Sequence, residues 1–467
     1  EKNDAVDYRG KRGNIKMRLS EKENANQPHR KKHLIAAFDR LIIHNHCIRL
    51  NNQVMEDFLT LSEAAEAIGK SKETLRRWDR EGKLTALREP VSNYRIYRKQ
   101  DVLSLFAEFI DEEIVPPSAD NFAAPLHDYG VLELFAGAGG LAVGMEQAGL
   151  KCLALNEIDK WACQTLRRNR PHWQVMEGDI AQFDFAAFQG KVDVVTGGFP
   201  CQAFSYAGKK LGLADARGTL FYEFARVVQE TMPPVCIGEN VRGLLNHDSG
   251  KTLQGMISIL DEIGYRVLPV QVLKAVHYHV PQKRERLILV GIRKDIATEF
   301  HYPKPAKHIY TLKDALKKGA LYASDVPESK GAAYPAYKKA VLDLVPPKGY
   351  WRDLPLDIQK EFMGGSFYLG GGKTGIARRI GWDEPCLTLT CSPAQKQTER
   401  CHPEETRPFT VREYARIQTF PDDWEFAGSM VQQYKQIGNA VPVNLAKEIG
   451  YCIVDFLNRY YSSSKPV

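Results

Sequence analysis

Segments that are typical of strands alternate with segments that are typical of amphipathic helices between Tyr129 and about Lys294. A connecting helix after each strand is the arrangement that a parallel sheet requires. The strands predicted from short apolar runs are 131–135, 152–156, 174–177, 192–196, 235–238 and 287–291. The alternation predicts an α/β fold with a Rossmann-like sheet, and such sheets bind ligands at the carboxyl ends of their strands.

Other parts of the chain lack this alternation and are expected to form separate modules. Residues 1–54 are basic and polar, and we expect a poorly ordered extension, or an untranslated segment if Met55 is the natural start. The expected boundaries are a small helical module at 55–112, a proline-containing linker at 113–128, the main α/β part at 129–294, a smaller domain at 295–405 and a segment that completes the α/β domain at 406–467.

The composition favours a cytoplasmic protein with free thiols. No apolar run approaches the roughly 20 residues that span a bilayer, and no signal peptide is visible. The nine cysteines include no CxxC pair, which favours a reducing compartment. Cys386, Cys391 and Cys401 with His402 come near a metal-ligand set, but their spacing fits no common zinc pattern, so no metal is expected. The net charge of +7 has the sign expected for a polyanion partner.

The small helical module resembles a winged helix-turn-helix of the MerR or excisionase type. Its predicted elements are helices 61–68, 72–80 and 101–109 and a hairpin wing within 84–97. The second helix is basic, and the resemblance implies that Arg76 and Arg77 contact DNA. The alternative is a small packing or dimerisation module whose basic helix is only a solvated face.

A glycine-rich turn, Phe135-Ala136-Gly137-Ala138-Gly139-Gly140, directly follows the first predicted strand and opens a helix. Glycines let backbone amides approach a ligand, and a helix N-terminus favours a negatively polarised group. The next two strands end in Glu157 and Asp179, where one carboxylate can bind a ribose diol and the other an adenine amino group. The three strand ends suit a nucleoside with a small charged tail, such as S-adenosylmethionine. A tight turn without a ligand is the alternative.

A second informative stretch is Gly197-Gly198-Phe199-Pro200-Cys201-Gln202-Ala203-Phe204-Ser205, which follows the predicted strand 192–196. A cysteine at the end of a buried strand, on a turn tightened by glycine and proline, faces the crevice that holds ligands. A thiolate at Cys201 would act as a nucleophile and not as a packing group.

With these residues together, the chain resembles the DNA cytosine-C5 methyltransferases. The resemblance extends from about Gly130 to Tyr451, and the motifs follow the family's order: FAGAGG (135–140), NEID (156–159), GDI (178–180), GGFPCQAFS (197–205), ENV (239–241), QKRER (282–286), RPFTVREYARIQTFPDDW (407–424) and YKQIGNAVP (434–442). It implies an S-adenosylmethionine-dependent methyltransferase domain of Rossmann-like fold, with a target-recognition domain in 295–405.

The resemblance also implies roles for individual residues. Cys201 corresponds to the nucleophile that adds to C6 of cytosine, and Glu239 to the carboxylate at N3 and the exocyclic amine. Arg284 and Arg286 correspond to arginines that hold the target nucleotide and orient the active site. The implied contacts to S-adenosylmethionine are Phe135, Ala136, Gly137, Gly139, Gly140, Glu157, Ile158, Asp179, Ile180, Pro200, Asn439 and Val441.

DNA contacts are expected in two places besides the N-terminal module. The stretch 201–219 resembles the family's active-site loop, in which Gln202, Ser205 and Arg217 match typical DNA-contacting positions. Basic residues of the recognition region are expected to contact phosphates or guanine edges, or else to be solvent-exposed charges. They are Lys373, Arg378, Arg379, Lys396 and Arg400.

The predicted function is methyl transfer to C5 of a cytosine flipped out of duplex DNA, because the target atom is unreachable inside a stacked duplex. The resemblance implies a monomer acting at the bacterial nucleoid and protecting DNA from a restriction endonuclease that acts at the same site and need not bind this chain. Two alternatives stay open: tRNA as the substrate, or a transcriptional regulator in which the methyltransferase domain is only a scaffold. No side chain is identified as the base that removes the C5 proton, and water is equally suited.

Overall fold

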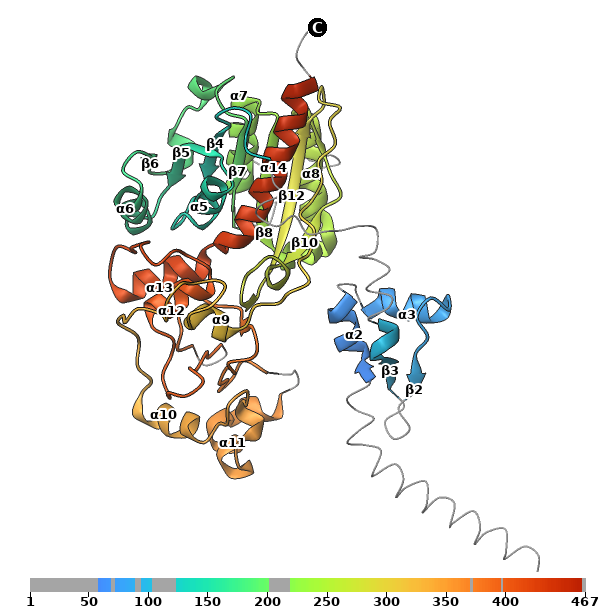
Figure 1. Cartoon of the computed structure of the whole chain (residues 1–467), viewed down its shortest axis with the longest axis vertical. Helices are drawn as coiled ribbons and strands as arrows, with labels where there is room; N and C mark the ends of the chain where they lie inside the picture. The colour runs from blue at the N-terminus through green and yellow to red at the C-terminus, as the bar shows by residue number, and fades with distance from the viewer. Residues whose placement is uncertain are drawn as a thin grey trace, which may run out of the picture. The chain divides into compact units, whose positions relative to one another are not determined.

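The computed structural model describes residues 58–68, 72–88, 94–102, 123–200, 219–369, 373–395 and 398–463. The chain divides into two compact units, Glu1–Ile114 and Val115–Val467 (Figure 1). Within the described residues, no helix is both long and apolar enough to cross a membrane.

The smaller unit combines two helices with a three-stranded antiparallel sheet in the order β1-β3-β2. Its elements are β1 (Phe58–Thr60), α2 (Leu61–Ile68), α3 (Lys72–Arg80), β2 (Leu87–Arg88) and β3 (Arg95–Arg98). Leu75 and Trp78, three residues apart and therefore on one face of α3, are buried against Ala64 and Tyr97. The predictions of helices 61–68 and 72–80 are confirmed. The predicted helix 101–109 is helical at 101–102, and its remainder lies outside the described residues.

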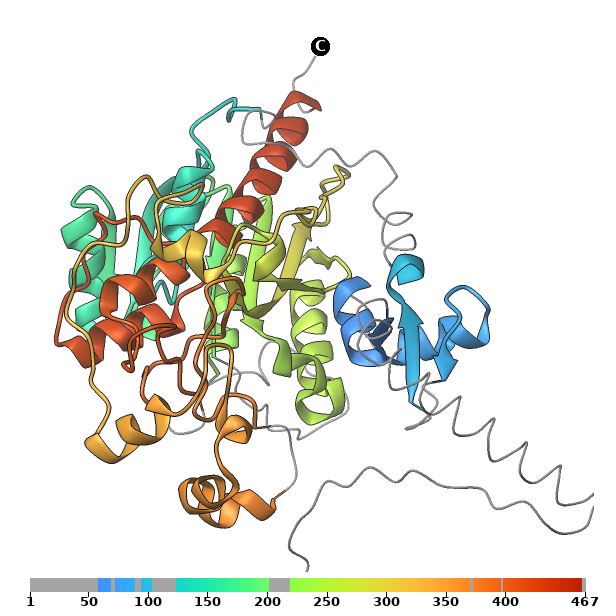
Figure 2. The ribbon, with the colours of Figure 1, turned by 60° about the horizontal axis from the view of Figure 1, so that its bottom comes forward.

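The larger unit is built on a twisted sheet that contains eight strands among the described residues (Figure 2). They are β4 (Gly130–Leu134), β5 (Lys151–Glu157), β6 (Gln174–Glu177), β7 (Val194–Gly197), β8 (Val235–Val241), β9 (Tyr265–Val267), β10 (Gln271–Lys274) and β12 (Glu285–Arg293). The order is β10-β12-β8-β7-β4-β5-β6, with β9 paired to β12. Neighbours from β8 to β6 are parallel, whereas β12 is antiparallel to β8, β9 and β10. The predicted Rossmann-like α/β fold is confirmed.

Helices cover both faces of this sheet because its central strands are apolar on both sides. On one face α5 (Gly140–Gln147) and α14 (Val443–Ser463) pack on Val131 of β4; on the other, α7 (Leu220–Thr231) and α8 (Lys251–Glu262) pack on Leu132 and Leu134. Gly144 lets α5 and α14 approach closely, since a Cβ there would lie 2.4 Å from Cβ of Ala446. Helix α14 is thus part of the core, although the strands against which it packs lie far earlier in the chain.

The remaining elements connect this sheet to a smaller, mostly helical region. They are α6 (Lys160–Asn169), β11 (Gln282–Lys283), α9 (Leu312–Leu316), α10 (Ala336–Asp343), α11 (Leu356–Met363), β13 (Cys386–Leu387), α12 (Val411–Ile417) and α13 (Met430–Asn439). Short 3₁₀ segments lie at Ile180–Gln182, Ala186–Phe188, Arg242–Gly250, Ala275–His277, Trp351–Asp353 and Gly364–Tyr368.

Residues 295–405 contribute to two different cores. Around α10 and α11, side chains such as Leu342 and Trp351 form a separate small core. Leu312 and Leu389, by contrast, pack with α12 and α13. The parallel pairing of β13 with β11 brings residues 388–391 back beside the main sheet. Through residues 388–391, the smaller region therefore contributes to the cavity that is described in the next subsection.

Candidate active site

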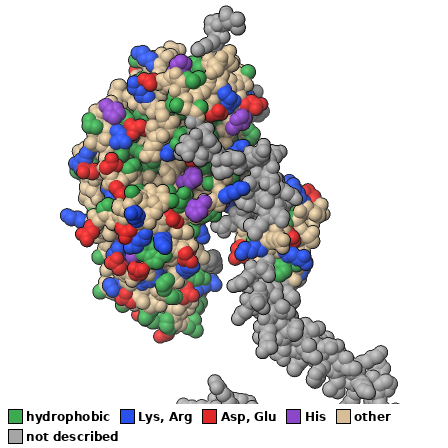
Figure 3. Space-filling model, in the orientation of Figure 1, with side chains coloured by type: hydrophobic (Ala, Val, Ile, Leu, Met, Phe, Trp, Pro, Cys, Tyr) green, Lys and Arg blue, Asp and Glu red, His purple; other side chains and the backbone are tan. Residues whose placement is uncertain are grey.

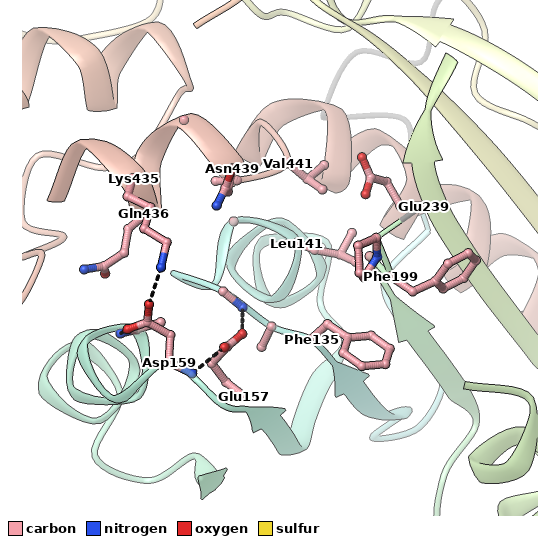
Figure 4. Close-up of a pocket in the computed structure, with 18 of the residues that line it drawn as sticks. Phe135, Leu141, Glu157, Asp159, Phe199, Glu239, Lys435, Gln436, Asn439 and Val441 are labelled. Carbon is pink, nitrogen blue, oxygen red and sulfur yellow. Dashed lines mark hydrogen bonds and ion pairs between the residues drawn. The ribbon is translucent and has the colours of Figure 1, made fainter. Parts of the chain in front are cut away.

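A cavity of about 880 Å³ lies at the carboxyl ends of the parallel strands (Figure 4). It is located where the strand order reverses between β4 and β7, which is the usual ligand position in open α/β sheets. Its lining residues lie within 133–141, 156–162, 178–180, 198–200, 239–241, 284–286, 388–391 and 435–441, and Leu220 also lines it. Of the cofactor contacts expected from sequence, the structure brings every one except Gly139 to this wall.

The glycine-rich turn forms one side of the cavity. Phe135, directly after β4, has a φ of 57°, a left-handed conformation that is rare for an aromatic residue and typical of functional sites. At Gly140 a Cβ would lie 2.2 Å from the carbonyl oxygen of Val441, so only glycine lets α5 begin against that segment. Gly139 lies behind the turn, where a Cβ would meet Leu166 at 2.7 Å. Its role is therefore to shape the turn.

Glu157, at the end of β5, is held by three backbone amides. Oε2 accepts a hydrogen bond from the N–H of Gly137 at 2.7 Å, and Oε1 accepts from Ile158 and Asp159 at 2.8 and 2.7 Å. Oε1 thus uses both of its lone pairs, whereas Oε2 keeps a second one. The buried carboxylate is fixed in orientation by these contacts and keeps acceptor capacity for a diol in the cavity (Figure 4).

An ion pair joins two walls of the cavity. Nζ of Lys435, on α13, lies 2.9 Å from Oδ2 of Asp159 (Figure 4). Oδ1 of Asp159 accepts from the backbone N–H of Trp161 and caps α6. Burial acts to raise the pKa of Asp159, but the hydrogen bonds from Lys435 and Trp161 outweigh it and leave that pKa below its usual value.

Glu239 and Arg286 lie together at the opposite end. They come from β8 and β12, whose register pairs Glu239 with Ile288 and Arg286 with Val241, so the two side chains are diagonal neighbours. Nε of Arg286 is 2.5 Å from Oε1 of Glu239. Burial raises the pKa of Glu239, although the charges of Arg286 and Arg284 oppose the shift. The carboxyl is thus prepared to hold a proton.

Arg284 connects three segments of the wall. Its guanidinium donates to the carbonyl oxygens of Leu389, Gly438 and Ala440 at 3.2, 3.0 and 3.0 Å. The side chain is fully buried, and burial lowers its pKa, with the charge of Arg286 adding to the effect. In the structure Arg284 therefore connects the walls, and its buried Nε has no hydrogen-bond partner among the described residues.

The chain after β7 leads into the cavity beside Glu239. Phe199 is buried against Phe221 and Phe224, with ring centroids 5.2 and 5.4 Å away, and its carbonyl accepts from Nδ2 of Asn240 at 2.8 Å. Gly198 is so close to the acid that a Cβ there would lie 3.0 Å from Oε2 of Glu239. The next residue after Pro200 is the predicted nucleophile. Cys201, Gln202, Ser205 and Arg217 lie outside the described residues.

Residues 129–455 match the family C-5 cytosine-specific DNA methylase. The chain belongs to this family. The Type II methyltransferase M.Eco47II of Escherichia coli is 60% identical to it over 88% of this chain and 98% of the relative. The Type II methyltransferase M.PspPI of a Psychrobacter species is 55% identical over 84% of this chain and 95% of the relative. The chain is a DNA (cytosine-5-)-methyltransferase, as predicted from its motifs.

Two further comparisons concern the fold. Residues 60–97 match the MerR family regulatory proteins, which confirms the predicted helix-turn-helix. The crystal structure of a Spodoptera frugiperda DNMT2 variant superposes with a TM-score of 0.50 and 18% identity, and it covers 70% of this chain and 99% of its own. The shared fold is that of the methyltransferase unit.

The methyltransferase cavity also contains residues that sequence reasoning missed. Glu133 interrupts the apolar run of β4, and a charged residue in a buried strand was a usable signal. Residues 388–391 reach the wall only through the β11–β13 pairing, for which the sequence carries no local signal. In this segment Sγ of Cys391 lies 2.8 Å from Oδ1 of Asn439. Among the described residues, no group of three or more His, Cys, Asp or Glu side chains is suited to hold a metal ion.

Burial argues against the predicted DNA contacts of Arg379 and of Arg400, whose guanidinium donates to the carbonyl oxygens of Thr388 and Glu399. The Arg379 guanidinium is buried and donates to the carbonyls of Val345, His402 and Leu342 at 2.8, 3.0 and 2.7 Å, and also to Thr406. In sequence, an arginine that stabilises a core cannot be distinguished from one that contacts a phosphate. Here the N–H groups of the Arg379 guanidinium stabilise the small core. Lys396 lies outside the described residues.

The other predicted contacts have partners of their own. Arg378 forms a bidentate pair with Glu384 at 2.8 Å, and Lys373 donates to the carbonyl oxygens of Ser366 and Leu369. Arg76 and Arg77 of α3 form exposed ion pairs with Glu73 and Glu81. On the face of the larger unit seen in Figure 3, basic and acidic side chains are interspersed.

Proposed function

We propose that this methyltransferase transfers a methyl group from S-adenosylmethionine to C5 of a cytosine flipped out of duplex DNA, through a covalent bond between Cys201 and C6. The position of Glu239 carries the proposal. It is a buried carboxyl with a raised pKa, beside Arg286 and next to the residues that lead to Cys201. A buried acid that keeps its proton suits the activation of a ring nitrogen.

The chemistry requires a nucleophile and an acid together, because C5 of cytosine is a poor nucleophile. Addition of the Cys201 thiolate to C6 breaks the ring's aromaticity, and hydrogen bonding or protonation at N3 by Glu239 makes C6 more electrophilic. C5 then becomes an enamine carbon that attacks the methyl group, and the methyl–sulfur bond breaks with its electron pair staying on sulfur, so that S-adenosylhomocysteine leaves. Loss of the C5 proton afterwards lets the Cys201–C6 bond break by elimination. Free cysteine has a pKa of about 8.5, so positive charge such as that of Arg286 favours the thiolate.

The cavity wall fits S-adenosylmethionine. The turn at 135–140 offers backbone amides, Glu157 keeps acceptor capacity for a ribose diol, and Asp179 lies at the next strand end. When bound, this molecule supplies the methyl group as an activated sulfonium. The chain's own residues orient it and, with the walls joined by Arg284, exclude water from the reacting end.

We infer that the substrate is double-stranded DNA at a specific site and that the enzyme, acting as a monomer in the bacterial cytoplasm, protects host DNA from a restriction endonuclease. The inference is supported by the relatives, which are named Type II methyltransferases. Flipping the base costs roughly a few kcal/mol. A separate small region around α10 and α11, opposite the sheet, is suited to hold the duplex while the base is out.

The test compares wild type with Cys201→Ala. Labelled S-adenosylmethionine is offered with duplex genomic DNA or with tRNA, and the products are digested to nucleosides. We expect 5-methylcytosine in DNA from the wild type only. Label in tRNA but not in DNA would replace the substrate assignment, and label from Cys201→Ala at the wild-type rate would overturn the covalent mechanism.

A second function is proposed for the smaller unit, namely binding of duplex DNA through α3. The match of residues 60–97 to MerR family regulatory proteins and the basic residues of α3 support it. Such a module raises the local concentration of DNA at the catalytic unit without new contacts there.

A further inference from the structure

A closed ring of hydrogen bonds joins segments that are far apart in the chain. Its buried side chains are Gln282, Gln418 and Arg284, none of them more than 2% exposed. Oε1 of Gln282 accepts from the N–H of Leu389 at 2.9 Å, and its Nε2 donates to Oε1 of Gln418 at 2.8 Å. Nε2 of Gln418 donates to the carbonyl oxygen of Ala440 at 3.2 Å. Arg284 donates to the carbonyl oxygens of Ala440 and Leu389, at 3.0 and 3.2 Å, and closes the ring.

The ring admits only one arrangement of its two glutamines. The N–H of Leu389 can only donate, so the amide oxygen of Gln282 must face it and the NH2 group must face Gln418. The carbonyl of Ala440 can only accept, so the NH2 group of Gln418 must face it. Reversal of either amide would set donor against donor and acceptor against acceptor. Two apolar side chains would fill this space without fixing how the segments meet, whereas a satisfied polar network specifies it.

The ring connects the small region around α10 and α11 to the wall that is expected to hold the cofactor. The segment 388–391 lines the cavity, and the chain continues from it to Ala394, which packs against the small core. The segment 435–441 contributes expected cofactor contacts and packs against the start of α5. Gln282 and Gln418 do not line the cavity themselves. Any effect of theirs on the reaction must therefore pass through these two segments.

We propose that Gln282 and Gln418 are positioning residues that couple the binding of duplex DNA to the binding of S-adenosylmethionine, an inference that rests on the function proposed above. A duplex held by the small region fixes the segment 388–391. Because the ring ties this segment to Ala440, the cofactor wall is ordered at the same time, and the cofactor then binds with a smaller ordering cost. The cofactor has the reciprocal effect on DNA, since the coupling free energy between two sites is the same in both directions.

The test measures this coupling on the full chain. The Kd of labelled S-adenosylhomocysteine, which cannot donate a methyl group, is measured by equilibrium dialysis without DNA and with saturating duplex genomic fragments that the wild type methylates. The ratio of the two Kd values is the coupling factor, which we expect to be at least about fivefold in the wild type. In Gln282→Met, Gln418→Met and the double variant we expect a factor close to unity, because each change opens the same ring.

Two further measurements separate positioning from a general loss of structure. Without DNA, the Kd of each variant should stay within about threefold of the wild-type value, whereas the single-turnover methylation rate should fall roughly ten- to a hundredfold. The matched control is Asn458→Leu on α14, which also removes a buried amide that joins distant segments. Asn458 bonds to Ala124 and Tyr129 and does not line the cavity, so this variant should keep the wild-type coupling factor.

A wild-type coupling factor in the glutamine variants, or its loss in the control, would overturn the proposal, as would a factor of unity in a wild type that methylates the DNA. If the glutamine variants do not fold, hydrogen exchange of the wild type decides. Residues 417–419 are buried and do not line the cavity, so neither ligand contacts their amides directly. We expect S-adenosylhomocysteine alone and the DNA fragments alone each to slow the exchange of these amides, because both ligands order the ring. Unchanged exchange with either ligand would overturn the proposal. A wild type that methylates no duplex DNA would instead overturn the proposed function.

Discussion

Arg286 and Glu239 stand on neighbouring antiparallel strands with Nε of the arginine 2.5 Å from Oε1 of the acid, and each side chain is only 11% exposed. The pair exists before any base is present. A cytosine that enters this end of the cavity must therefore share the carboxyl with the arginine. The contact fixes the acid's orientation in advance, which is how enzymes avoid reorganisation during the reaction.

Replacement of Glu239 should remove acid catalysis and its pH dependence. Since burial raises the pKa of this carboxyl, the protonated form persists to higher pH than usual, and the wild-type rate should fall as pH rises through that pKa. In Glu239→Gln we expect the single-turnover methylation rate to fall by roughly 10²- to 10⁴-fold and this pH limb to vanish. Glu285→Gln, which removes the partner of Arg242, is the control. A variant that keeps the limb would exclude Glu239 as its source.

The ion pair between Asp159 and Lys435 should contribute to cofactor affinity modestly. Half of the Lys435 side chain is exposed, so the pair is screened, and its loss should raise the KM for S-adenosylmethionine by no more than about fivefold. Asp159→Asn, Lys435→Met and the double variant are compared at low and high salt. We expect the double variant to resemble either single one. Additive effects would show that the two residues act separately, and Lys339→Met, in an exposed pair with Asp343, controls for surface charge.

Gly140→Ala should destabilise the catalytic unit. The added Cβ would lie 2.2 Å from the carbonyl oxygen of Val441, and backbone must move to admit it. We expect a loss of about 1–3 kcal/mol in the free energy of unfolding, measured by denaturant titration. Gly365→Ala is the matched control, because a Cβ there meets nothing within 4 Å. Equal stability of the two variants would mean that the 440–441 segment yields without cost.

Arg76 and Arg77 should affect DNA affinity and not turnover. Both pair with exposed acids, so their replacement costs little stability. In the double variant Arg76→Gln/Arg77→Gln we expect weaker DNA binding, a salt dependence reduced by about one unit of slope per lost phosphate contact, and an unchanged kcat at saturating DNA. Lys99→Gln serves as a basic control in the same unit. An unchanged salt slope would show that α3 does not contact DNA.

The spacing of apolar residues was sufficient to predict those helices and strands whose bounds depend on neighbouring residues in the chain. The strand 174–177 and the helices at 61–68 and 72–80 have the bounds that their apolar spacing predicts. Glu157 and Asp179 could be placed because the carboxyl ends of parallel strands meet at one edge.

The features that could not be predicted from the sequence depend on contacts between segments that are distant in the chain. The guanidinium of Arg379 is buried because it donates hydrogen bonds to the carbonyl groups of Leu342, Val345 and His402, which are distant in the chain. Residues 388–391 line the cavity only because Cys386 pairs with Gln282 across a long insertion. Neither relation leaves a periodic or compositional trace, because each depends on how separate segments dock.

The segment 435–441 and helix α14, which pack against the start of α5, follow the other described elements of the catalytic unit in chain order. A nascent chain that ends before them carries the glycine turn, both strand-end acids and Glu239, yet lacks a wall of its cavity. We therefore expect a chain that stops before residue 435 to be inert as a methyltransferase.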